Sequence, residues 1–261
     1  MSMGKAYQGN ALNSKSVQSP IRMINSVSPV QNMSSSDLSC GQSAQKAAKS
    51  PHEAGPLMTY MASCGSAGCA NFDSSFARWF EIEESGFRSD GTWAMKSLFG
   101  GLPANLVLPS NIAPGGYLIH HEIPALQKAQ TEGGADLYPS CAQLRVGGSQ
   151  FWEPQLTTSF PGAYSTDSGI LVNVYPLTGQ YEFTGPAVSN LEGMTLAALA
   201  TNETAAVDSP SGRVSRVMHA PQESAVLLTF LHPPLLTFLR LPSSLLPRHY
   251  LLSPYSHSLR I

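Results

Sequence analysis

The chain has 261 residues, enough for one large domain or two small ones with a sizeable core. Charged residues make up 12% of it and the formal net charge is -2, so no electrostatic attraction to nucleic acid or to an anionic membrane is indicated. No run of about 18 apolar residues occurs, so no transmembrane helix is expected. The 22 glycines and 20 prolines favour short strands joined by turns over a helix-rich fold.

In chain order, composition first predicts a polar, disordered segment over residues 1–20. Residues 21–188 then contain many short apolar runs bounded by turn residues, which predicts an all-β fold, an immunoglobulin-like or fibronectin-like β-sandwich with long loops. The strand candidates in this part are 57–62, 76–82, 102–108, 117–123, 142–146, 169–175 and 180–183.

Residues 189–261 are interpreted as a linker followed by a tail rich in leucine and proline. We interpret this tail as translated non-coding sequence, and a leucine-rich segment that binds a partner is the alternative, although its prolines prevent one continuous helix. In the linker, Asn202-Glu203-Thr204 is a glycosylation acceptor if the chain is secreted.

Four cysteines allow three disulfide pairings. Cys64 and Cys69 lie in a short glycine-containing loop and could close a local disulfide, which would leave Cys40 and Cys141 for a long-range bridge. Four free thiols or a zinc site are less favoured, because the spacings do not form two metal-binding knuckles. Disulfides indicate an oxidising, secreted setting, yet residues 1–20 show no apolar run of the length that a secretory signal needs.

The stretch richest in functional side chains is 117–141, YLIHHEIPALQKAQTEGGADLYPSC. In a strand that begins at Tyr117, His120 and Glu122 share one face, while His121 lies among apolar side chains on the other. We interpret His121 as a hydrogen-bonded core histidine. Pro124 is expected to end regular strand pairing because it has no N–H to donate.

Two residues at the end of this stretch, Asp136 and Tyr138, fall on the same side of the next expected strand. A tyrosine two residues from a carboxylate fits two interpretations. The first is a packed ring with a solvated hydroxyl, and the second is a metal ligand with its outer-shell partner.

These residues resemble the fungal lytic polysaccharide monooxygenases of auxiliary activity family nine, copper enzymes that oxidatively cleave cellulose and related β-glucans. The resemblance runs from about residue 21 to about residue 188. It implies a secreted β-sandwich with copper as cofactor, cellulose or another β-glucan as partner, an external electron donor, and O2 or H2O2. It also implies disulfides between Cys40 and Cys141 and between Cys64 and Cys69. Besides 117–141, the blocks that carry it are 55–62, 144–146, 160–164, 167–175 and 185–186.

The family's copper is held by the amino group and side chain of an N-terminal histidine and by a second histidine, with a tyrosine near an axial position. Such nitrogen ligands in a near-planar arrangement suit Cu(II). By resemblance, His52 corresponds to the second histidine and Tyr138 to the axial tyrosine. Gln127 stands where the family usually has an outer-shell histidine, and Asp136 stands where it has a glutamine. A glutamine donates hydrogen bonds but cannot shuttle protons near neutral pH, and an anionic Asp136 would alter the electrostatics near copper.

Two further departures concern the start of the chain. No histidine precedes His52, so the N-terminal histidine ligand is absent, and residues 41–51 are shorter than the family's connection by about one strand and its turn. Two functions are therefore expected. One is a copper-dependent lytic polysaccharide monooxygenase by descent, and the other, favoured by Gln127 and Asp136, is a non-catalytic polysaccharide-binding or pseudoenzyme member.

Overall fold

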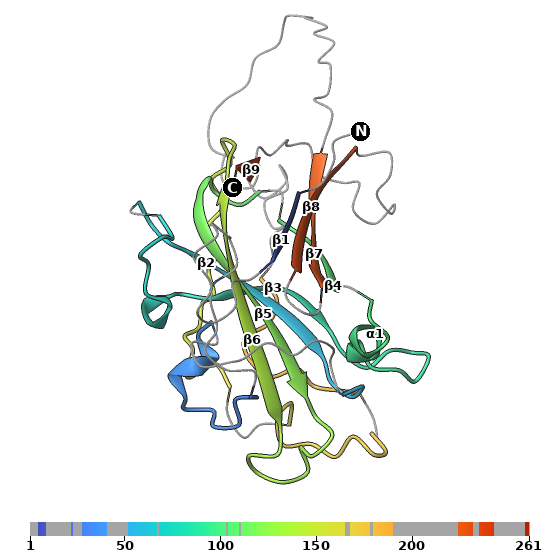
Figure 1. The fold of residues 1–261 in the computed structure, drawn as a ribbon. Coiled ribbons are helices and arrows are strands. Elements are labelled where there is room, and N and C mark those ends of the chain that lie inside the picture. The colour runs from blue at the N-terminus through green and yellow to red at the C-terminus, as the bar shows by residue number, and fades with distance from the viewer. Residues whose placement is uncertain are drawn as a thin grey trace, which may run out of the picture.

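A computed structural model of the chain is shown in Figure 1. It describes residues 22, 28–40, 52–66, 68–102, 104–109, 111–164, 168–177 and 180–189, and the backbone alone of 5–8, 224–231, 235–242 and 259–260. No helix in these ranges is long and apolar enough to span a membrane.

Strands dominate the described residues, and helix is limited to short turns, which confirms the all-β prediction. The helical elements are α1 (Met95–Phe99) and two 3-10 turns, η1 (Ser36–Leu38) and η2 (Ser74–Phe76). The strands are β1 (Lys5–Gln8), β2 (Leu57–Ser63), β3 (Phe80–Ser85), β4 (Ala104–Val107), β5 (Gly115–Ala125), β6 (Asp136–Val146), β7 (Ser224–Leu231), β8 (Leu235–Pro242) and β9 (Leu259–Arg260).

The strands form two sheets, a five-stranded sheet in the order β3-β2-β5-β6-β9 and a four-stranded sheet in the order β1-β8-β7-β4. In the larger sheet the long strands β5 and β6 lie side by side (Figure 1) and pair antiparallel from Gly115↔Val146 to Ala125↔Asp136. Strand β2 pairs with the other edge of β5. Because β2 runs antiparallel to β5, the start of β2, the end of β5 and the start of β6 lie at one end of the sheet.

Apolar side chains cover both faces of the larger sheet. On one face Ile119 of β5 and Met61 of β2 pack with Leu106 of β4, which joins the two sheets as in a β-sandwich. On the other face Leu118 and Tyr60 pack beneath the loops that precede β2 and follow β6. The period-two assignment of the β5 side chains is therefore confirmed, because Leu118 and Ile119 belong to opposite faces.

Several strand boundaries differ from the sequence prediction. Strand β5 continues past Pro124, which lies opposite Leu137 although it has no N–H to donate. No strand forms among the described parts of 168–177 and 180–189. These segments instead lie as loops on the core, tied to it by hydrogen bonds such as that from the Val172 N–H to the Ala129 carbonyl at 2.8 Å. Their apolar side chains reflect burial against the sheet rather than strand pairing.

The backbone also forms strands in both terminal segments. Strand β1 lies within residues 1–20, where composition predicts disorder, and it pairs with β8. Strands β7, β8 and β9 lie within residues 189–261, where β7 pairs with β4 and β9 pairs with β6. The shortened connection 41–51 and the glycosylation acceptor at Asn202 lie outside the described residues.

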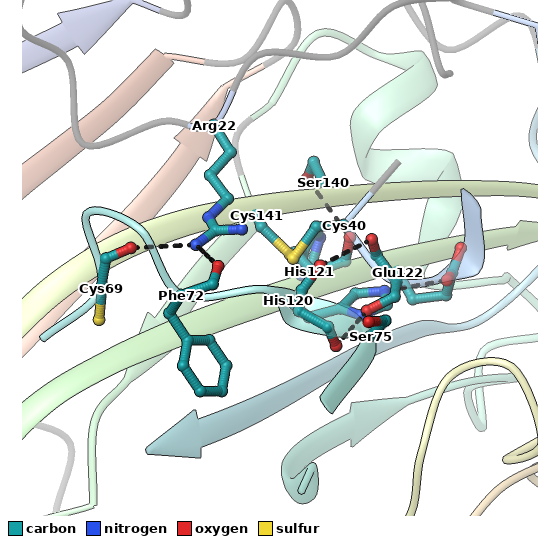
Figure 2. The surroundings of a disulfide bond; sticks show 12 residues. Arg22, Cys40, Cys69, Phe72, Ser75, His120, His121, Glu122, Ser140 and Cys141 are labelled. Atoms are coloured by element: carbon teal, nitrogen blue, oxygen red, sulfur yellow. Dashed lines mark hydrogen bonds and ion pairs between the residues drawn. A yellow bond between two sulfur atoms is a disulfide. The ribbon is translucent and has the colours of Figure 1, made fainter. Parts of the chain in front are cut away.

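Two disulfides fasten the loops to the sheet, and they join the pairs that the resemblance implies. Cys40 binds Cys141 on β6, and Cys64 binds Cys69 in the loop after β2. Figure 2 shows the first bridge with the Arg22 guanidinium nearby, whose Nη2 donates to the Cys69 carbonyl at 3.1 Å and to the Phe72 carbonyl at 2.6 Å. This arginine therefore connects the segment before the long-range bridge to the loop that holds the local one.

Candidate functional site

His52 lies in the loop that leads into β2, and two backbone contacts hold this loop against the end of β5. The Leu126 N–H donates to the Ala54 carbonyl at 2.8 Å. Gly55 lies so close to the neighbouring strand that a Cβ there would be 1.9 Å from the Pro124 carbonyl oxygen. Only glycine allows this approach, which brings His52 beside the residues that follow β5.

Asp136, the first residue of β6, accepts hydrogen bonds from two side-chain amides. Gln127 Nε2 donates to Asp136 Oδ2 at 2.9 Å, and Gln31 Nε2 donates to Asp136 Oδ1 at 2.7 Å. Asp136 is only 8% exposed, so these amides replace much of the water that would otherwise solvate its charge. Gln127 and Asp136 thus form a direct contact, with Gln31 as a third member that sequence reasoning did not select.

His52 approaches this group through its Nε2 atom, which is 3.4 Å from Gln127 Nε2 and 3.9 Å from Asp136 Oδ2. An ionised carboxylate only accepts hydrogen bonds, so the atom of Gln127 that faces Asp136 must be the nitrogen. This nitrogen has a second hydrogen to donate, and His52 Nε2 is then its acceptor. His52 accordingly carries its proton on Nδ1 when it is neutral.

The electrostatic environment keeps both His52 and Tyr138 neutral near pH 7. Burial lowers the pKa of His52, while the Asp136 charge raises it and the Lys128 charge lowers it further. Burial, assisted by the Asp136 charge, raises the pKa of Tyr138 to about 12. The rings of His52 and Tyr138 lie 6.2 Å apart, so the site combines a neutral imidazole, a protonated phenol and one carboxylate.

An open cavity of about 510 Å³ borders His52 and Gln127. Tyr175 lines it with 62% of its surface exposed, and Lys96 and Glu53 supply charged groups. An exposed aromatic ring next to polar side chains suits a ligand with both apolar faces and hydroxyl groups, because the ring offers contact area and the polar groups offer hydrogen bonds. Tyr175 was not selected from the sequence, which carries no signal that a loop tyrosine will be exposed beside the site.

The described residues do not complete the copper site that the resemblance implies. His52 is the one imidazole at this site among them, and they contain no group of three or more His, Cys, Asp or Glu side chains suited to a metal ion. His120 and His121 are buried in the sheet instead, where His120 Nε2 lies 3.0 Å from Glu122 Oε2 and His121 Nδ1 lies 3.0 Å from Thr59 Oγ1. The interpretation of His121 as a core histidine is confirmed.

A separate group of buried polar side chains lies on the loop-covered face of the sheet. The Tyr164 hydroxyl donates to the Tyr60 hydroxyl at 3.2 Å, the His120 ring lies 5.7 Å from the Tyr60 ring, and Glu122 is buried beside His120. Neither carboxylate oxygen of Glu81 has a hydrogen-bond partner among the described residues, and burial raises the pKa of Glu81 to about 9. This carboxyl is therefore neutral at pH 7. The alternation of residues in this strand did not predict that Glu81 is buried.

Fold and site together define a disulfide-bonded β-sandwich protein with an open polar site at one end of its larger sheet. Loops before β2 and after β5 supply His52 and Gln127, and β6 supplies Asp136 and Tyr138. The residues selected from the sequence for this site are thus brought together.

The chain belongs to Auxiliary Activity family 9 (formerly GH61), whose sequence profile matches residues 1–182. It is 42% identical over 212 residues to AA9 family lytic polysaccharide monooxygenase D from Gloeophyllum trabeum, an alignment that covers 72% of this chain and 62% of that protein. It is 43% identical over 138 residues to the D enzyme of Geotrichum candidum, covering 52% of this chain and 42% of the relative. The chain thus spans less than two thirds of the length of these relatives.

Solved structures of similar proteins confirm the β-sandwich fold. The crystal structure of HiLPMO9B matches with a TM-score of 0.57 at 30% identity, covering 70% of this chain and 93% of that one. A cellulose-active polysaccharide monooxygenase from M. thermophila matches with a TM-score of 0.59 at 28% identity, covering 70% and 92%.

Proposed function

We propose that this chain acts on cellulose or a related β-glucan as a lytic polysaccharide monooxygenase outside the cell. The observation that carries this proposal is the meeting of His52, Gln127, Asp136 and Tyr138 at one end of the sandwich. These residues occupy the ligand and outer-shell positions of the family by resemblance. The two disulfides suit an oxidising environment.

The described residues have binding and positioning roles in this proposal. Tyr175 offers its exposed ring to a sugar face, and Lys96 and Glu53 are available to sugar hydroxyls. Asp136 holds Gln127 in place, and Gln127 in turn orients the His52 ring through Nε2. The family reaction uses copper, an external electron donor and O2 or H2O2. Its complete copper site needs nitrogen donors beyond those that the described residues bring together.

A non-catalytic glucan-binding protein is the second candidate, and one observation favours it. Gln127 lies 3.4 Å from His52 Nε2 and directs a hydrogen at it, so the nitrogen that would face a metal ion is already used. In this case the sandwich and the exposed Tyr175 would serve binding alone.

Copper binding separates the two candidates. Calorimetry with Cu(II) and electron paramagnetic resonance on the oxidised full chain should show one tight site that His52→Ala removes, if the monooxygenase proposal holds. Soluble oxidised sugars should then appear from cellulose with a reductant and H2O2. Weak copper binding that His52→Ala leaves unchanged would reject this proposal. Retained cellulose binding that Tyr175→Ala weakens would then identify the glucan-binding alternative.

A further inference from the structure

Asn32 begins a short exposed turn that carries a complete N-glycosylation acceptor, Asn32-Met33-Ser34. The turn lies between the bridge that Val30 forms with β6 and the 3-10 turn η1. Among the residues for which the structure describes side chains, Asn32 is the one asparagine followed by any residue and then by serine or threonine. The acceptor at Asn202 lies outside the described part.

The turn fixes the orientation of the Asn32 side-chain amide. The Ser34 N–H donates to Asn32 Oδ1 at 2.9 Å, and the Ser35 N–H donates to the Asn32 carbonyl at 3.0 Å. A backbone N–H can only face an acceptor, so the amide oxygen must point into the turn. The nitrogen Nδ2 then lies on the other side of the amide, and it takes part in no hydrogen bond among the described residues.

The surroundings leave room for a large substituent on this nitrogen. Asn32 and Ser34 are exposed, and they stand at the rim of a cavity of about 590 Å³. Leu171, also in its lining, is 41% exposed. A sugar attached at Asn32 would meet solvent and this cavity rather than the packed core, so the folded chain can carry it.

This cavity is distinct from the one beside His52. The two share no lining residue, and the chain of hydrogen bonds from Gln127 through Asp136 to Gln31 lies between them.

We propose that Asn32 is N-glycosylated when the chain enters the secretory pathway. In this reaction Asn32 Nδ2 displaces the diphosphate from the first sugar of a lipid-diphosphate-linked oligosaccharide. The Nδ2–C1 bond forms, the C1–O bond to the diphosphate breaks, the lipid diphosphate leaves, and the amide loses one proton, with no oxidation or reduction. The inference rests on the proposed function only in that it needs the chain to be secreted.

The chain contains a matched internal control at Asn173. This residue is exposed, and its Oδ1 accepts from the Tyr175 N–H at 3.1 Å, which is the same local arrangement as at Asn32. The second residue after Asn173 is a tyrosine, so the acceptor hydroxyl is missing. Exposure and the hydrogen bond to Oδ1 are therefore matched, whereas the acceptor hydroxyl is missing and Pro176 has no N–H to donate to the Asn173 carbonyl.

The test uses the full chain behind a heterologous secretion signal in yeast, with an added Asn-Ala-Thr acceptor in a C-terminal tag. Chains that carry a glycan on the tag are isolated from whole cells and medium, so every chain counted has entered the secretory pathway whether or not it folds. Peptide N-glycosidase in heavy-oxygen water then converts each glycosylated asparagine to a labelled aspartate, which peptide mass spectrometry locates.

We expect label at Asn32 and none at Asn173. Asn32→Gln and Ser34→Ala should each remove one oligosaccharide from the mass of the intact chain, whereas Ser34→Thr should keep it. An unlabelled Asn32 peptide in tag-glycosylated chains would overturn the proposal. Calorimetry with Cu(II) on the same protein, compared with His52→Ala, reads the proposed function separately, so failure of one proposal does not imply failure of the other.

Discussion

At the scale of single residues, the site is organised by a carboxylate whose two oxygens each accept one hydrogen bond from an amide. Asp136 is nearly buried, and no Lys or Arg forms an ion pair with it among the described residues. Gln31 and Gln127 come from segments far apart in the sequence, and each donates one hydrogen bond to Asp136. The orientation of Gln127, and through it that of His52, therefore depends on a carboxylate at position 136.

Asp136→Asn tests this dependence. An asparagine would turn its own NH2 group toward one of the two donor amides, leaving a buried N–H without an acceptor. We expect a loss of about 1 to 3 kcal/mol in the free energy of unfolding, measured with urea. Glu132→Gln makes the same chemical change at an exposed position and should cost less than about 0.5 kcal/mol. Equal stability of the Asp136→Asn protein and the wild type would contradict the role assigned to Asp136.

Glu81 leads to a pH prediction. Burial, with the Glu84 charge adding to it, raises its pKa from 4.5 to about 9. Between these values the unfolded chain has lost the proton while the folded chain retains it. The contribution of Glu81 to stability is therefore complete below pH 4.5 and falls as the pH rises toward 9.

Urea unfolding at a series of pH values measures this contribution. Glu81 alone should make the free energy of unfolding fall by up to about 1.4 kcal/mol per pH unit between pH 4.5 and 9. Glu81→Gln keeps the shape and removes the titration, so it should flatten the slope. Part of the slope should persist, because burial also raises the pKa of Glu83 to about 7. A slope that Glu81→Gln leaves unchanged would mean that Glu81 is ionised in the folded chain.

At the scale of elements, close backbone contact between the His52 loop and β5 forms the site. The contact depends on Gly55, where a Cβ would overlap the Pro124 carbonyl oxygen, and on the hydrogen bond between Leu126 and Ala54. Two segments about 70 residues apart are thus joined by backbone contacts. The position of His52 relative to Gln127 follows from this joint.

Gly55→Ala should separate these elements. Overlap with a backbone atom cannot be relieved by rotating a side chain, so we expect a loss of about 2 to 4 kcal/mol in unfolding free energy. The His52 ring signal in NMR spectra should shift as well. Gly115→Ala is the matched control, because a Cβ there meets only Tyr117 Cε2 at an ordinary 3.6 Å. If both variants were equally stable, the loop would not lie against β5 as described.

At the scale of the whole molecule, the long-range disulfide supplements a sandwich whose loops lack regular hydrogen bonding. The Cys40–Cys141 bridge spans 101 residues of sequence, whereas the Cys64–Cys69 bridge spans 5. In the chain-entropy view, a bridge stabilises the fold by restricting the unfolded chain, and the restriction grows with loop length. The two bridges should therefore contribute unequally.

Paired alanine variants measure this difference. Removing Cys40 and Cys141 together should lower the free energy of unfolding by about 4 to 5 kcal/mol, and removing Cys64 and Cys69 by about 2 kcal/mol. Chemical unfolding of the oxidised proteins provides the measurement, with the wild type under reducing conditions as a third state. The reverse order of the two losses would show that loop length does not govern the stability of this fold.

Much of the fold was accessible from local sequence patterns, and the reasons are physical. Alternation in 117–123 correctly placed His120 and His121 on opposite faces of β5, because side chains alternate along any strand. The same kind of pattern was misleading in 169–175 and 180–183, where apolar side chains pack from loops. Local hydrophobicity reports burial, and it does not report whether a neighbouring strand is available for pairing.

For the candidate site too, some features could be predicted from the sequence and others could not. The chemical groups of the site, His52, Gln127, Asp136 and Tyr138, could be predicted before the fold was known, because the motifs around them resemble those of the family. Which of these groups touch, and which partners complete them, follows only from the folded structure. Gln31 reaches Asp136 only because the bridge between Val30 and Leu137 places two segments side by side, although they are 105 positions apart. Local sequence carries no record of such contacts, because chain folding rather than spacing brings them together.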